Sequence, residues 1–341
     1  MNGTSSAVQL SGGFTALDWV VVLGVLLGTT LVAGRVSGRQ ESVRDFFLGA
    51  RRLPWWAVSA SIVATEISAV TYISLPSVVQ REGGNITYLQ IGLFGSLLAR
   101  AFVGYVLVPA YYEREIYSPY DYVGQKLGSQ ARALTTGLFT LGGILAQSAR
   151  VYLTAVVLQV LLASELAAVE AAMGLPPLVT AVAAIGIVAV AWTWMGGMAT
   201  VIWTDAILFL LFLVGIAVSL ITLHGVLDEG LPAAIREGYA AGKLTLIDTS
   251  LDPTRPYTLW VALFVASWGQ IGPYGCDHLM TQRLFCCKNA RDARRAILAS
   301  IVAMAVVFLV MLIGVGLWAY YREHPLGPAA QAMVSAKPDR I

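Results

Sequence analysis

Four ionisable side chains lie inside long apolar segments of this 341-residue chain: Glu66, Arg100, Arg150 and Asp205. Placing a charge in a bilayer costs at least ~2.5–3.5 kcal/mol on insertion scales, so each residue is a candidate for function. The guanidinium of Arg150 suits a substrate carboxylate, although it could instead form a structural ion pair with Glu66. Arg100 could extend its side chain to the cytoplasmic membrane surface. Asp205 could bind a cation or cap a helix.

Polar residues interrupt two of the apolar segments. The segment 56–80 contains the run Thr65-Glu66-Ile67-Ser68-Ala69-Val70-Thr71, and the segment 259–280 contains Ser267-Trp268-Gly269-Gln270-Ile271-Gly272-Pro273-Tyr274-Gly275. In hydrocarbon, an opened backbone is tolerated only where it lines a cavity or is buried in protein. The second run also contains three glycines and a proline, which weaken a helix. We therefore expect both helices to open within these runs, a Pro kink without function being the alternative for the second.

A helix opened in the first run would expose oxygen ligands. Carbonyls freed from Ala64 and Ile67 would suit a hard cation such as sodium, and the hydroxyls of Ser68 and Thr71 lie one turn apart on the same face. Those hydroxyls could equally bond their own backbone or a neighbouring helix. Further candidate substrate contacts are Glu66 and three residues outside this run: Gln90, Trp268 and Gln270.

The spacing of the interruptions points to transport. The chain is 57% hydrophobic and 12% charged, with a mean hydropathy of +0.72, whereas soluble domains carry about 25% charged residues. We predict a single all-α membrane domain with eight spans at 16–33, 56–80, 87–110, 133–164, 177–194, 199–223, 258–280 and 296–320. The interrupted helices are five spans apart, which is the spacing expected for an inverted five-helix repeat of the kind found in secondary transporters. Repeat one would cover 56–223, and 258–320 would begin repeat two.

Charge sets the expected orientation and excludes other classes. Basic residues concentrate in the loops after the first, third and seventh spans, which places those loops inside and the N-terminus outside. The segment 224–257 would then be an outer loop containing a short helix. A net charge of +2 gives no indication of a nucleic-acid partner. No Ser-His-Asp set, phosphate loop or zinc cluster occurs within the spans, so we predict that the chain is not an enzyme.

Four stretches of the sequence resemble the sodium:solute symporter family, with its LeuT-like core. They are FFLGARRLPWW at 46–56, ATEISAVTY at 64–72, WMGGMATVIWTD at 194–205, and QRL at 282–284 followed by a basic loop at 288–295. The resemblance implies that the carbonyls of Ala64 and Ile67 contribute to the main sodium site, and that Asp205 serves a second sodium site found in some members.

The site residues are similar to those of the bacterial sialic-acid symporters. In that subgroup the positions of Ser68, Thr71, Gln90 and Arg150 bind substrate, and the resemblance implies that Arg150 meets the carboxylate. Glu66 departs from the subgroup, where an uncharged residue is expected. The chain departs again at its end: the family core has ten helices after the leading one, and seven are present here. The absent eighth core helix supplies hydroxyl ligands for both sodium sites.

We therefore predict a sodium-coupled symporter that imports a small organic anion, such as sialic acid or a monocarboxylate, by alternating access. Its partners would be sodium, the substrate and the lipid bilayer, and a bacterial inner membrane is the expected location. One alternative keeps symport but changes the substrate to a sugar, or to an amino acid whose ammonium group Glu66 would bind. Another alternative is a membrane sensor that uses the same fold without transport.

Overall fold

A computed structural model describes residues 14–37, 42–114, 116–325 and 327, and within them the chain forms helices and loops without a β-strand. The helices are α1 (Ala16–Ser37), α2 (Val43–Leu48), α3 (Trp55–Glu66), α4 (Ala69–Gln80), α5 (Tyr88–Gln90), α6 (Leu97–Phe102), α7 (Val108–Glu113), α8 (Pro119–Leu127), α9 (Ser129–Leu161), α10 (Ala163–Met173), α11 (Pro177–Val226), α12 (Gly230–Ala240), α13 (Ser267–Ile271), α14 (His278–Phe285), α15 (Ala290–Ala299) and α16 (Ala303–Glu323). Wider π-helical turns form η2 (Ile91–Ser96), η3 (Val103–Leu107), η4 (Val261–Ala266) and η5 (Gly272–Cys276), and tighter 3-10 turns form η1 (Gly49–Arg51) and η6 (Ser300–Val302).

The apolar helices follow the predicted spans. Within the described residues, those long and apolar enough to cross a membrane are Tyr88–Glu113, Ser129–Leu161, Pro177–Trp194, Gly197–Val226 and Ala290–Glu323. The bent pair α3 and α4 makes a sixth span if it is counted as one. The predicted spans at 16–33 and 258–280 are also helical, but the apolar part of α1 is shorter, and the other alternates α-helix with π-helical turns.

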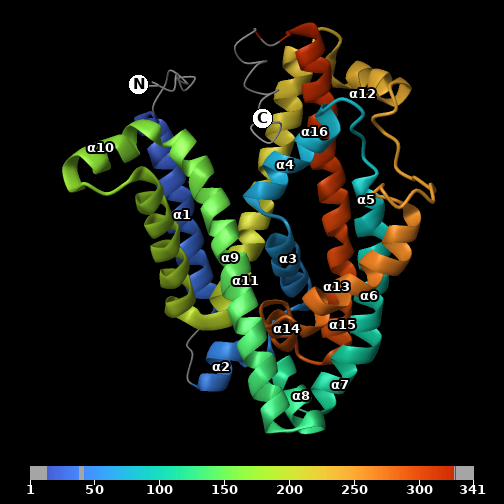
Figure 1. Cartoon of the computed structure of the whole chain (residues 1–341). Coiled ribbons are helices and arrows are strands. Elements are labelled where there is room, and N and C mark those ends of the chain that lie inside the picture. The colour runs from blue at the N-terminus through green and yellow to red at the C-terminus, as the bar shows by residue number, and fades with distance from the viewer. Residues whose placement is uncertain (1–13, 38–41, 115, 326, 328–341) are drawn as a thin grey trace, which may run out of the picture.

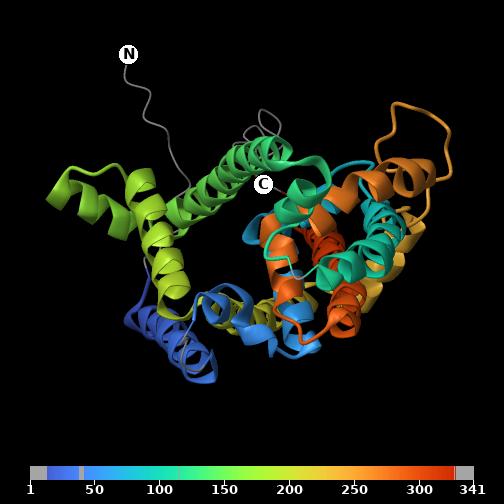
Figure 2. The ribbon, with the colours of Figure 1, turned by 90° about the horizontal axis from the view of Figure 1, so that it is seen from below.

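The helices form two groups, and the break in the first interrupted segment lies within one of them (Figure 1). Figure 1 shows α1, α9 and α10 on one side, and α3, α4 and α12–α16 with α5–α7 on the other. Seen from below in Figure 2, α9 bridges between the groups. One buried apolar cluster includes Val58 and Ile62 of α3, and another includes Leu75 and Val79 of α4. Val63 and Ile67 also belong to the second cluster, so the break itself packs within that cluster.

The first interrupted segment opens as predicted. α3 ends at Glu66, Ile67 adopts an extended conformation (φ −95°, ψ 118°), and α4 begins at Ala69. The two helices meet at an angle of 60°. No glycine or proline occurs between Ala64 and Thr71, so local side-chain hydrogen bonding, rather than backbone flexibility, accounts for the opening.

The second interrupted segment opens later than predicted. The run 267–275 remains helical as α13 and η5, and the chain becomes extended only at Asp277 (ψ 126°). The reason is that π-helical turns absorb the glycines and the proline: the amide of Asp277 donates to the carbonyl of Gly272, five residues back, at 3.0 Å. The carbonyl of Gly275 accepts from the Tyr111 hydroxyl at 2.8 Å instead. Asp277 then caps α14 through its carboxylate.

The segment 224–257, predicted to be an outer loop, contains the expected short helix, α12, and places a lysine between helices. Lys243 is 4% exposed, and its ammonium donates to the carbonyls of Val79 at 2.9 Å and Arg81 at 2.6 Å at the end of α4. A positive charge at a helix C-terminus is stabilising. Burial, with the neighbouring Arg81 charge, lowers the pKa of this ammonium. The loop is therefore anchored to the C-terminal end of α4.

Candidate functional site

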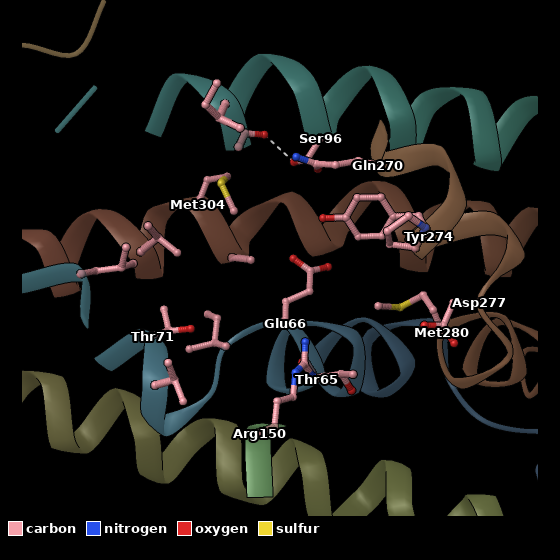
Figure 3. Close-up of a pocket in the computed structure, with 18 of the residues that line it drawn as sticks. Thr65, Glu66, Thr71, Ser96, Arg150, Gln270, Tyr274, Asp277, Met280 and Met304 are labelled. Atoms are coloured by element: carbon pink, nitrogen blue, oxygen red, sulfur yellow. Dashed lines mark hydrogen bonds between the residues drawn. The ribbon is translucent and has the colours of Figure 1, made fainter. Parts of the chain in front are cut away.

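A cavity of about 480 Å³ adjoins the break between α3 and α4. This volume lies within the range of about 300–1,000 Å³ that is usual for small-molecule sites. Figure 3 shows Glu66 and Thr71 from the two halves of the broken helix, Arg150 from α9, and Tyr274 from η5 around it. The other lining residues are Thr65, Ile67, Val70, Ser74, Leu75, Tyr88, Ile91, Gly92, Ser96, Gln147, Gln270, Pro273, Asp277, Leu279, Met280, Ala303, Met304 and Val307.

Five of the predicted site residues line this cavity: Glu66, Ile67, Thr71, Arg150 and Gln270. They come from α3, the break, α4, α9 and α13, so both interrupted segments contribute to one site. The remaining predicted residues (Ala64, Ser68, Gln90, Trp268 and Asp205) do not line it. Two further lining residues, Tyr274 and Asp277, were not among the predicted ligands, although both belong to the second interrupted segment.

The backbone at the first break has been released from its helical pairing. In a continuous helix the amide of Ser68 would bond the carbonyl of Ala64, four residues back. Here that amide donates to Thr71 Oγ1 at 3.3 Å, as part of a capping box at the start of α4. Next to it, the carbonyl of Thr65 accepts from Arg150 Nη1 at 3.3 Å. Side chains have thus replaced two helical hydrogen bonds. The Thr65 carbonyl is bonded by Arg150, and the Ala64 carbonyl no longer receives the Ser68 amide.

Glu66 pairs with a different arginine from the one expected. Arg100 Nη2 lies 2.7 Å and 2.5 Å from the two carboxylate oxygens of Glu66. Arg100 is fully buried, so the idea that its side chain reaches the membrane surface is wrong. Arg150 makes no ion pair with any residue in the described part of the chain, and its Nη1 donates to the Thr65 carbonyl. The spacing of Ser96 and Arg100, one helical turn apart, was a signal for this polar cluster.

Three other predicted site residues do not line the cavity, and two of them have structural partners. Gln90 is completely buried, donates to the Tyr257 carbonyl at 2.6 Å, and accepts from the Asp248 amide at 3.3 Å. It therefore holds the loop that follows α12 rather than facing the cavity. Trp268 is 75% exposed on the outside of α13. Ser68 caps α4. Stacking by Trp268 and hydrogen bonding by Gln90 to a substrate in this cavity are not supported by these positions.

Asp205 belongs to a second polar cluster, formed with Ser61 of α3 and Arg283 of α14. Its Oδ2 accepts from Ser61 Oγ at 2.6 Å and from Arg283 Nη2 at 3.0 Å. Arg283 also donates to Ser61 Oγ at 2.9 Å. Arg283 thus supplies the positive charge beside this carboxylate. The interpretation that Asp205 merely caps a helix does not fit, because its contacts join three separate helices.

Comparisons with known proteins agree with this geometry. The family model of the sodium:solute symporters matches residues 46–337. Sodium-coupled monocarboxylate transporter 1 of Homo sapiens is 27% identical over 97% of this chain and 52% of its own length. The sodium/sialic acid symporter of Proteus mirabilis is 26% identical over 92% of this chain and 60% of its own length.

A solved structure has the same arrangement of helices. It is a substrate-bound, outward-open state of a Na⁺-coupled sialic acid symporter, and it matches 92% of this chain and 63% of its own at 25% identity, with a TM-score of 0.76. The predicted all-helical, LeuT-like membrane fold is thereby confirmed. The chain spans about half the length of the curated relatives it matches. With the family model covering most of the sequence, the chain belongs to the sodium:solute symporter family.

Proposed function

We propose that this chain provides the substrate and main cation contacts of a sodium-coupled symporter for a small carboxylate. The observation that carries the proposal is the position of Arg150, whose guanidinium reaches a released backbone carbonyl at the cavity beside the broken helix. With no acidic partner among the described residues, it is available to a substrate. A guanidinium offers paired N–H donors that match the two oxygens of a carboxylate.

The break supplies the cation site. Because the Ser68 amide bonds Thr71 Oγ1, the Ala64 carbonyl is free to face a cation together with that of Ile67. Carbonyl oxygens are ligands of hard cations, and half-helix ends of this kind coordinate sodium in related folds. Sodium bound at this position would order the break beside the cavity. It would thereby raise substrate affinity, a reciprocal coupling that is typically about 1–3 kcal/mol.

The relatives support the choice of substrate and ion. Their names describe sodium-coupled transport of monocarboxylates or of sialic acid. Both substrates are small organic anions, and both would place a carboxylate against Arg150. Asp205 remains our candidate for a second sodium site, in which case sodium and Arg283 would share its carboxylate.

A zwitterionic amino acid is the second candidate substrate, on one observation. Asp277 lines the same cavity as Arg150, and its carboxylate caps α14 through only one hydrogen bond, from the Leu279 amide at 2.8 Å. It could therefore accept an ammonium group. Glu66 is poorly suited to that role because Arg100 already binds both of its oxygens.

We further propose a bacterial inner-membrane location with the N-terminus outside. The support is the concentration of arginines in the loops after the first, third and seventh spans. In this orientation α12 and the Lys243 loop lie outside, and the Asp205–Arg283 pair lies toward the cytoplasm. Labelling of single cysteines introduced into α12 and α8 with an impermeant reagent on whole cells would check it.

The first experiment is a thermal-shift panel on the purified protein in detergent. Sodium and potassium are compared, each with N-acetylneuraminate, pyruvate, galactose or proline. We expect stabilisation that requires sodium and a carboxylate together, because a ligand raises the unfolding temperature only when it binds the folded state. Arg150→Ala should remove the carboxylate response.

The matched control is Arg132→Ala in the same helix, where the arginine pairs with Asp121 away from the cavity. It should leave the response intact. A carboxylate response that survives in Arg150→Ala would refute the role of this residue. A response to galactose but to no carboxylate would replace the anion by a sugar, and a response to proline alone would favour the zwitterion.

A further inference from the structure

Arg100 connects the two interrupted segments at a single point. Besides the Glu66 carboxylate, it contacts Ser300 Oγ through Nε at 2.9 Å and donates through Nη1 to Ser96 Oγ. Its guanidinium carbon lies 4.3 Å from the centre of the Tyr274 ring. Every nitrogen of this side chain is therefore engaged. The partners come from α3, η2, η5 and η6, so one buried residue joins the first break to the second interrupted segment and to the base of α16.

The ion pair between Arg100 and Glu66 changes the net charge of the cavity lining. Three charged side chains line the cavity: Glu66, Arg150 and Asp277. Thr65, whose carbonyl Arg150 contacts, is the residue before Glu66, so the guanidinium of Arg150 reaches α3 one residue away from Glu66. Uncompensated, the Glu66 carboxylate would repel an anion at Arg150 or form an ion pair with Arg150 itself. Both outcomes weaken anion binding.

We propose that Arg100 is a positioning residue that neutralises Glu66 and turns its carboxylate away from Arg150, which makes the cavity selective for anions. The inference rests on the proposed function, because it deepens the account of the same site. Arg100 does not touch the substrate. It acts through Glu66, held in place by Ser96, Ser300 and the face of Tyr274.

The test compares two single variants with the double variant. Arg100→Gln leaves the Glu66 charge uncompensated, so the dissociation constant for pyruvate or N-acetylneuraminate in sodium should rise by about tenfold or more. Glu66→Gln/Arg100→Gln removes both charges at once, and anion affinity should return to within about threefold of the wild type. Glu66→Gln alone leaves an extra positive charge and should bind the anion at least as tightly as the wild type.

Substrate charge supplies a readout that a purely structural role would not move. Arg100→Gln should gain affinity for proline relative to pyruvate, because the released carboxylate attracts an ammonium group. The matched control is Arg294→Gln, since Arg294 also packs on an aromatic ring, that of Tyr105 at 4.7 Å, but lies outside the cavity. It should change neither affinity nor preference.

The outcomes separate this inference from the function on which it rests. A double variant as weak toward anions as Arg100→Gln would overturn the inference, because loss of structure rather than of charge balance would then explain both. If Arg100→Gln does not fold, weakened anion binding by Glu66→Gln has the same meaning. A wild-type protein that responds to no carboxylate in sodium would overturn the proposed function, and the selectivity with it.

Discussion

The two interrupted segments look alike in their polarity but are built differently. Between α3 and α4 the backbone opens without glycine or proline, and the helix axis turns by 60°. In the segment from η4 to α14, three glycines and a proline leave the helix intact until Asp277. The difference shows that a helix opens where side chains replace its hydrogen bonds. Residues that only weaken a helix are accommodated by wider turns.

The largest expected effect tests why glycine occupies position 275 in a segment that it does not open. A Cβ there would lie 2.5 Å from Leu107 Cδ1 and 2.9 Å from Val103 Cγ2, so Gly275→Val should overpack this contact. We expect a loss of about 1–3 kcal/mol in unfolding free energy, measured by thermal or chemical denaturation in detergent.

Gly269→Ala is the control for that change, because a Cβ at position 269 meets nothing within 4 Å. It should be neutral or slightly stabilising, since alanine favours the helix. If Gly275→Val were equally harmless, close packing would not explain the glycine.

An intermediate effect is expected where the second segment does open. Asp277→Ala removes the carboxylate that accepts a hydrogen bond from the Leu279 amide at the start of α14. Loss of such a cap costs about 1 kcal/mol, whereas Asp277→Asn keeps an acceptor and should retain most of the stability. Equal melting temperatures for all three proteins would show that α14 is held by its packing alone.

The smallest effect on stability is expected at the first break. Thr71→Val removes the acceptor of the Ser68 amide, with a net cost of about 0.5–1.5 kcal/mol. The Ser68 amide can then form the helical hydrogen bond to the Ala64 carbonyl, and this bond would compete with sodium for the carbonyl oxygen. Thr71→Ser should behave as the wild type. A sodium-dependent thermal shift of normal size in Thr71→Val would separate this hydroxyl from the cation site.

Much of the fold follows from the sequence because apolar length and charge placement are local properties. The apolar spans, the short helix α12 and the opening at Ile67 all come from runs of neighbouring residues. The position of the second opening was predicted wrongly. The choice between a broken helix and a π-helical turn depends on neighbours such as Tyr111, whose hydroxyl donates to the Gly275 carbonyl. That contact joins residues 164 positions apart.

The site was less accessible from sequence for the same reason. Arg150 and Glu66 were predicted from the cost of a charge in an apolar segment, and Thr71 from its hydroxyl; all three line the cavity, and their role as ligands stays a prediction. The partner of Glu66 could not be chosen from the sequence, because two arginines on different helices offered the same chemistry, and only packing decides that Arg100 is the buried one. Gln90 was predicted to contact substrate but bonds Tyr257 and Asp248, because a buried amide can bond a loop as readily as a substrate.

One close contact limits how the broken helix can move. A Cβ at Gly314 of α16 would lie 2.5 Å from the carbonyl oxygen of Pro76 and 2.8 Å from its Cα, so α4 and α16 touch along their backbones. The outer end of α4 is held as well, by the ammonium of Lys243. With these two contacts, any movement of α4 relative to α3 would carry α16 and the loop of Lys243 with it.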